Sequence, residues 1–162
     1  MTAMDTGAGW TVFHEISVGE EEEMNRQDAK DAKRREPSQE IDRLAYEVIG
    51  AAIEVHRVLV PGFLESVYHK SLKQELEMRG IPCEYKKTIP VRYKGYQVGE
   101  YELDFVVANV LIVELKAVER LAPIHDAQVM SYLKTTKLPL GLLINFNVPV
   151  LKEGIKRIIL SS

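Results

Sequence analysis

Two acidic residues and a lysine interrupt neighbouring apolar segments in the middle of the chain. Asp104 lies within the segment 101–107, and Glu114 and Lys116 end an apolar run that begins at Val110. Carboxylate oxygens bind hard divalent cations such as Mg²⁺, and a bound cation polarises a phosphoryl group and activates water. A lysine beside them can stabilise developing negative charge. The set suits phosphodiester hydrolysis, whereas the alternative is a charged solvent face, since an E-x-K tripeptide is common by chance.

Asp104 and Glu114 can share a cation only if both side chains leave the same face of a sheet. Side chains alternate along a strand, so the register of the two strands decides this. A two-residue loop after Val107 would place the acids on opposite faces. A three-residue connection would pair Val107 with Leu111 and set the acids opposite each other, and Asn109 tolerates the positive φ that it requires. We therefore expect the three-residue connection.

Further candidate residues lie on the predicted helices that flank these strands. Glu65 begins a helix and is the candidate third acid, although an ordinary first-turn acid favoured by the helix dipole is the alternative. Tyr68 follows one turn later on nearly the same face, and we expect it to pack with its hydroxyl toward the site. Gln128 and Tyr132 are i and i+4 on a later helix, one turn after His125. This polar face could hold a phosphate or stack a base, or it could be a polar stripe at the rim of the core.

The order and spacing of these motifs resemble those of a nuclease superfamily. Asp104 with the Glu114-x-Lys116 tripeptide is similar to the active-site signature of the PD-(D/E)xK nucleases. The G-x-x-E-x-x-Y motif at residues 62–68 and the Q-x-x-x-Y motif at residues 128–132 resemble the exonuclease-like branch of that superfamily. Taken together, residues 41–160 resemble the small bacterial GxxExxY protein family, although Leu103 stands where the superfamily name has proline.

This resemblance implies a fold, a cofactor and a substrate class. The fold would be an α/β, restriction-endonuclease-like sandwich, and the activity a Mg²⁺- or Mn²⁺-dependent cleavage of nucleic acid, with DNA the favoured substrate. The alternative is a non-catalytic module of the same fold that binds nucleic acid or a protein partner. The resemblance implies a metal held by Asp104, Glu114 and Glu65, a water activated with the help of Lys116, and a substrate contacted by Gln128, Tyr132, Tyr68 and His125.

Hydrophobic periodicity and chain breakers predict the elements that position these residues. Ser38 is a plausible N-cap, Pro61-Gly62 and Gly80 end helices, and Pro123 suits a first helical position. The predicted order is ααβββαβα around one mixed sheet. We expect helices over residues 38–60, 64–79, 123–135 and 150–160, and strands over residues 84–93, 96–107, 110–116 and 138–145.

Composition and charge place the chain among small water-soluble proteins. Its 162 residues suit a single domain, which we expect at residues 38–162, after a disordered or loosely helical acidic tail over residues 1–37. Residues 1–39 hold nine acids and five bases, which gives them a charge of −4. The whole chain has a net charge of −3, so the remainder carries +1. That balance permits a nucleic-acid substrate without indicating one.

Compartment and chain start can also be addressed from the sequence. The single cysteine, Cys83, excludes an internal disulfide and suits a reducing cytoplasm, and no apolar run approaches the length of a membrane span. A homodimer would suit so small a nuclease. The run Gly19–Glu23 directly precedes Met24, and its codons would resemble a bacterial ribosome-binding site. Met24 is therefore a candidate natural start, and the alternative is a genuine acidic tail.

Overall fold

The computed structural model describes residues 17–160, except for the side chains of residues 28–35. It forms two units, of which the first ends at Arg34 and contains most of helix α1 (Val18–Arg35). Ser17 caps this helix, because its hydroxyl accepts from the Glu20 amide while the Glu20 carboxylate accepts from the Ser17 amide. Residues 18–35, which the sequence predicted to be disordered or loosely helical, therefore form a capped helix. Residues 1–16 lie outside the described part of the chain.

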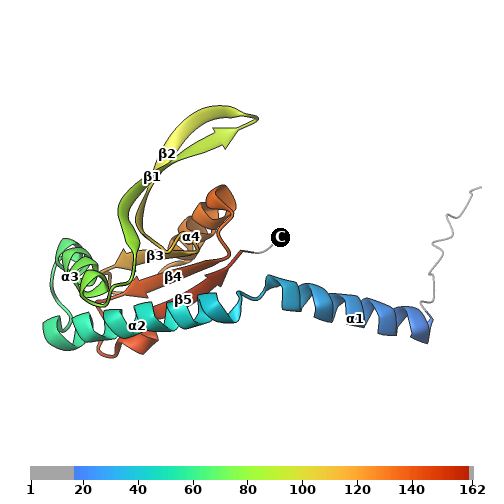
Figure 1. The fold of residues 1–162 in the computed structure, drawn as a ribbon, viewed down its shortest axis with the longest axis horizontal. Helices are drawn as coiled ribbons and strands as arrows, with labels where there is room; N and C mark the ends of the chain where they lie inside the picture. The colour runs from blue at the N-terminus through green and yellow to red at the C-terminus, as the bar shows by residue number, and fades with distance from the viewer. Residues whose placement is uncertain (1–16, 161–162) are drawn as a thin grey trace, which may run out of the picture. The chain divides into compact units, whose positions relative to one another are not determined.

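The second unit is built on one five-stranded mixed sheet in the order β1-β2-β3-β4-β5 (Figure 1). Strands β3 and β4 are parallel, and every other neighbouring pair is antiparallel. The α/β sandwich predicted from the sequence is confirmed. The strands are β1 (Cys83–Tyr93), β2 (Tyr96–Val107), β3 (Leu111–Lys116), β4 (Leu140–Asn145) and β5 (Ile155–Ile159).

Helices cover both faces of this sheet. Helices α2 (Gln39–Leu59) and α3 (Glu65–Met78) pack their apolar stripes on one face, where a large core forms around side chains such as Leu72 and Leu142. Helix α4 (Pro123–Thr136) packs on the other face over a smaller core that includes Leu133 and Ile112. Gly141 allows α4 to lie close to β4, because a Cβ there would stand 2.5 Å from Val129. Within residues 17–160 no helix is long and apolar enough to cross a membrane.

The boundaries of these helices follow the local signals in the sequence. The Ser38 hydroxyl caps α2 by accepting from the Ile41 amide, and Pro123 is the first residue of α4. Gly80 ends α3 with a φ of 66°, in the left-handed region that glycine adopts without strain. Lys94 and Gly95, both with positive φ, form the two-residue turn between β1 and β2. These four predictions are confirmed.

The predicted closing helix over residues 150–160 is wrong. A short 3-10 turn (η1, Leu151–Gly154) leads into strand β5, which pairs antiparallel with β4. The apolar residues of this segment recur at helical spacing, which suggested a helix. The open edge of β4, however, offers a row of backbone partners to a β-branched segment, and that tertiary pairing outweighs the local period.

The hairpin of β1 and β2 extends well beyond the sheet (Figure 1). Strand β2 pairs with β3 only from Phe105 to Val107. The rest of the hairpin, residues 86–103, is a two-stranded ribbon that we call the hairpin arm. Its base packs against α4 through Ile89, Tyr101 and Leu103, whereas residues 92–100 are exposed on both faces.

Candidate active site

The connection between β2 and β3 sets the register that the site requires. Val107 lies opposite Leu111, across the three residues Ala108, Asn109 and Val110. Ala108 and Asn109 have φ angles of 48° and 57°, in the left-handed region. The predicted three-residue connection is therefore confirmed, and continuing its register sets Asp104 opposite Glu114.

Asp104 lies where the hairpin arm leaves the sheet. Leu103 and Phe105 are two residues apart on one strand, yet they join different cores. On the partner strand, Lys86 has a φ of 53° between the pairs Tyr85–Phe105 and Lys87–Leu103, although the register does not shift there. Asp104 reaches β3 with its side chain, because its Oδ2 accepts a hydrogen bond of 2.8 Å from the Leu115 amide.

Glu114 is buried on the sheet face that α4 covers. Its side chain is 5% exposed, and its Oε1 lies 3.3 Å from Nζ of Lys116, two residues along the same strand and so on the same face. Its Oε2 is buried and has no hydrogen-bond partner. A buried carboxylate oxygen without a partner is costly, so this atom marks a place that a cation or water would satisfy.

Burial and mutual repulsion disfavour charge on both acids. Burial, followed by the negative charge of Asp104, raises the pKa of Glu114 to about 8. Burial also raises the pKa of Asp104, against the opposing effects of the Leu115 amide and of His69. Two acids with raised pKa values beside a lysine are typical of a functional site and costly in a purely structural role.

Glu65 does not contact this acid pair directly. Its side chain is 46% exposed at the first position of α3 and lies 3.4 Å from Nε2 of His69. The same Nε2 lies 3.4 Å from Oδ2 of Asp104. His69 therefore separates the third predicted acid from the pair. Among residues 17–160, no three His, Cys, Asp or Glu side chains are assembled closely enough to hold a metal ion.

His69 is a site residue that the sequence analysis missed. Its side chain is 7% exposed, and neither ring nitrogen has a hydrogen-bond partner. The ring is held between Tyr85 and Phe105, with both ring centroids 5.9 Å away. Its position four residues after Glu65, on the same face of the helix, was the available signal.

Helix α4 brings Gln128 and Tyr132 to the acids. The Gln128 amide donates to the Tyr132 hydroxyl over 2.6 Å, and the Tyr132 ring packs edge-on against Tyr101 of the hairpin arm. Burial, followed by the negative charge of Glu114, raises the pKa of Tyr132 to about 12, which places the hydroxyl within the field of the acid pair. Tyr132 thus lies beside the acid pair, and we call Tyr132 and the Gln128 side chain bonded to it the α4 wall.

The structure does not bring His125 and Tyr68 to that wall. Nδ1 of His125 accepts a hydrogen bond of 3.0 Å from the Ala122 amide at the start of α4. Tyr68 is fully buried and stacks on Phe146, and its hydroxyl donates to the Val60 carbonyl over 2.6 Å. The expected direction of the Tyr68 hydroxyl is therefore wrong, because the backbone of the loop before α3 occupies it.

Asn145 is a second residue that the sequence analysis missed. It is 1% exposed at the end of β4, beside Lys116 in the parallel pair. Its side chain accepts from the Val118 amide over 3.0 Å and donates to the Val118 carbonyl over 2.8 Å. These two bonds fix the segment that follows Lys116 and so hold the lysine at the site.

Comparison with known protein families agrees with this arrangement. A family model described as PD-(D/E)XK nuclease superfamily matches residues 42–158, which include both acids, Lys116 and all of α4. Searches of curated proteins and of solved structures gave no match. With an acid pair, an adjacent lysine and a mixed sheet between helices, the chain belongs to the PD-(D/E)XK nuclease superfamily.

Proposed function

We propose that this protein is a divalent-metal-dependent nuclease whose active site is centred on Asp104 and Glu114. The observation that carries the proposal is the partnerless Oε2 of Glu114 beside a second, half-buried acid, Asp104. Both acids have raised pKa values, and a cation between them would offset burial and mutual repulsion at once. Carboxylate oxygens of this kind fit Mg²⁺ or Mn²⁺.

The residues of the chain divide the work of phosphodiester hydrolysis among them. Asp104 and Glu114 would hold the metal, which when bound polarises the phosphoryl group and lowers the pKa of a water. Lys116, 3.3 Å from Glu114, would orient the attacking water and stabilise the charge that develops on the phosphate. The Leu115 amide keeps Asp104 aimed at the site through its 2.8 Å hydrogen bond.

Glu65 would act through the waters of the metal. Its carboxylate is separated from Asp104 by His69, so direct ligation would require a change of side-chain conformation. Its exposure leaves room for water between it and the acid pair. This favours the water-bridging role for Glu65 over that of a third direct ligand.

Substrate contacts would come from the wall formed by α4. The Gln128 amide and the Tyr132 hydroxyl are already joined by a 2.6 Å hydrogen bond, so they present an oriented donor pair to a phosphate. We propose DNA as the substrate, in line with the G-x-x-E-x-x-Y and Q-x-x-x-Y motifs. His125 would act only indirectly, by fixing the start of α4.

A cleavage assay with a matched lysine variant tests this function. Purified protein is incubated with linear, nicked and single-stranded DNA and with RNA, in Mn²⁺, Mg²⁺ or EDTA. We expect metal-dependent cleavage of DNA that falls about 10²–10³-fold in Lys116→Ala. Lys152→Ala, which removes an exposed lysine on η1, should cleave like the wild type. Absence of cleavage of every substrate would instead favour the non-catalytic module.

A further inference from the structure

A groove lies beside the candidate site, between the hairpin arm and the C-terminal end of α4. Its cavity of about 470 Å³ is lined by residues of both elements. A second cavity of about 310 Å³ adjoins it and shares Ile89 and Thr136. The residues that line the first cavity are Ile89, Pro90 and Arg92 of β1 and Lys134, Thr135 and Thr136 of α4.

Two cations without ion-pair partners in the described part of the chain line this groove, and two more follow them closely in the sequence. Arg92, Lys94, Lys134 and Lys137 are exposed, and none of the four has an ion-pair partner among the described residues. Arg92 donates only to the Gly95 carbonyl, over 3.2 Å. The cations at the base of the arm differ, since Lys86 pairs with Glu102 and Lys87 pairs with Glu84.

Glu100, the acid nearest in sequence to the tip of the arm, does not neutralise these cations. Glu100 accepts a hydrogen bond of 3.2 Å from the Gln97 amide and forms no ion pair. One acid against four cations gives the groove and the tip of the arm a net positive charge. A polyanion is therefore the partner whose charge complements this surface.

Exposed aromatic rings accompany the charge at the tip of the arm. Tyr93 is 62% exposed and Tyr96 is 77% exposed, on either side of the two-residue turn. Nζ of Lys94 lies 5.4 Å from the centre of the Tyr93 ring. Rings next to cations bind single-stranded nucleic acid, because bases stack on the rings while the cations hold the phosphates. An acidic protein surface would use the cations but not the rings.

We propose that the hairpin arm and the C-terminal end of α4 bind a single strand of nucleic acid that continues into the candidate active site. This inference rests on the proposed function and names its substrate track. Helix α4 carries both parts, since Tyr132, bonded to Gln128, lies in the field of the acid pair and Lys134–Thr136 line the groove. Gln128 and Thr136 are separated by about 12 Å along the helix axis, so a strand of a few nucleotides could span both parts.

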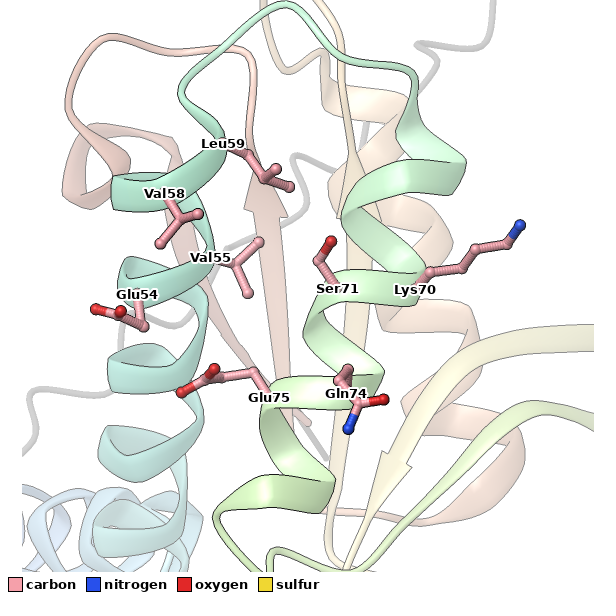
Figure 2. A pocket seen from close by; sticks show the side chains of 8 residues that line it. All are labelled: Glu54, Val55, Val58, Leu59, Lys70, Ser71, Gln74 and Glu75. Atoms are coloured by element: carbon pink, nitrogen blue, oxygen red, sulfur yellow. The ribbon is translucent and has the colours of Figure 1, made fainter.

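A different cavity, between α2 and α3, has less of the unpaired charge that makes this groove suitable for a polyanion. The cavity between α2 and α3, about 340 Å³ in volume, has Val55, Val58 and Leu59 facing Ser71 (Figure 2). Its acids, Glu54 and Glu75, pair with Arg57 and Arg79. Apart from Lys70, the charges of that surface are neutralised and its floor is apolar, so it complements a polyanion poorly. Lys70 at its rim provides a matched control cation.

Binding of a single strand to the full-length protein tests the proposal. Fluorescence anisotropy of a labelled 20-nucleotide single-stranded DNA is measured in EDTA, where no cleavage occurs. We expect Arg92→Glu with Lys134→Glu to weaken binding at least tenfold and to reduce the slope of log K against log salt by about 1.4. Tyr93→Ala and Tyr96→Ala should each weaken binding about fivefold. The double variant Lys70→Glu with Lys152→Glu should bind like the wild type. Equal binding by wild type and arm variants, or no binding at all, would overturn the proposal.

A small substrate separates this proposal from the proposed function. Bis(p-nitrophenyl) phosphate lacks the further nucleotides that the groove would bind, so the arm variants should hydrolyse it in Mn²⁺ at the wild-type rate. Loss of that hydrolysis in the arm variants would overturn the substrate track, because the arm would then support the site itself. If no substrate is cleaved while binding still depends on the arm, the nuclease function fails and the binding surface stands.

Discussion

Val107 of β2 lies directly opposite Leu111 of β3, across a connection in which Ala108 and Asn109 both have positive φ. Because side chains alternate along a strand, this pairing decides that Asp104 and Glu114 meet. One residue fewer would move Glu114 to the face covered by α2 and α3. The acid pair is therefore a property of loop length as much as of residue type.

Deleting Asn109 should abolish metal binding. The two-residue connection would pair Val107 with Val110 and separate the acids, so Mn²⁺ should no longer raise the melting temperature. In the wild type, Mn²⁺ at a hundred times its Kd should stabilise the fold by about 2.7 kcal/mol. Asn109→Gly, which keeps the loop length and accepts a φ of 57°, should retain that stabilisation. A metal-dependent shift in the deletion variant would contradict the register argument.

Stability without metal should depend on pH through Glu114. The pKa of this acid is about 8 in the fold against an ordinary value of 4.5, so the folded protein binds the extra proton between these limits. The free energy of unfolding in EDTA should therefore fall as pH rises from about 4.5 through 8, and Asp104 should act in the same direction. Urea unfolding at several pH values measures this free energy. Glu114→Gln should flatten most of this decline, and an undiminished decline in that variant would refute the assignment.

Replacing His69 should affect metal binding more than stability. His69 lowers the pKa of Asp104, so His69→Leu should leave Asp104 more protonated and weaken Mn²⁺ binding, by a factor that shrinks as pH rises, as measured by calorimetry. Its ring nitrogens make no hydrogen bond, and Nε2 contacts the Glu65 and Asp104 carboxylates only at 3.4 Å, so the apolar side chain should change stability by less than the loss of a hydrogen-bonded histidine.

His56 provides the matched control for that variant. It is also a buried histidine, but its Nε2 lies 2.7 Å from the Val148 carbonyl. His56→Leu should therefore cost about 1–3 kcal/mol and leave the Mn²⁺ affinity unchanged. If His69→Leu destabilises the fold and leaves metal binding unaltered, His69 has only a packing role.

Two tyrosines distinguish a substrate contact from a core contact. Tyr132→Phe removes the hydroxyl that Gln128 contacts, so it should raise KM several-fold and cost about 1 kcal/mol of stability. Tyr68→Phe removes bonds to the Val60 carbonyl and the Phe63 amide from a buried ring, so it should cost about 2 kcal/mol or more. KM of the Tyr68 variant should be unchanged. Thermal unfolding and steady-state cleavage measure the two effects.

The sequence predicted those parts of the fold that local chemistry decides. The Ser38 cap, the Lys94-Gly95 turn and the three-residue connection each follow from a few adjacent residues and were confirmed. The segment 155–159 was mistaken for helix because its partner strand lies ten or more residues away in the sequence. The position of Glu65 relative to the acid pair could not be predicted either, since it depends on how α3 packs and on the ring of His69.

The side chain of Asn145 makes the pair of backbone hydrogen bonds that a neighbouring strand residue would make. By bonding both the amide and the carbonyl of Val118, it extends the β3–β4 ladder past the last backbone pair at Lys116. The backbone oxygen of Asn145 in turn leaves no room at Gly154, where a Cβ would stand 2.4 Å away. Random mutagenesis should therefore find inactivating substitutions at Asn145 and Gly154, in β4 and η1, although neither element supplies the acid pair or its lysine. Mutations at the residues that hold Lys116 in place would then reduce activity as strongly as mutations of Lys116.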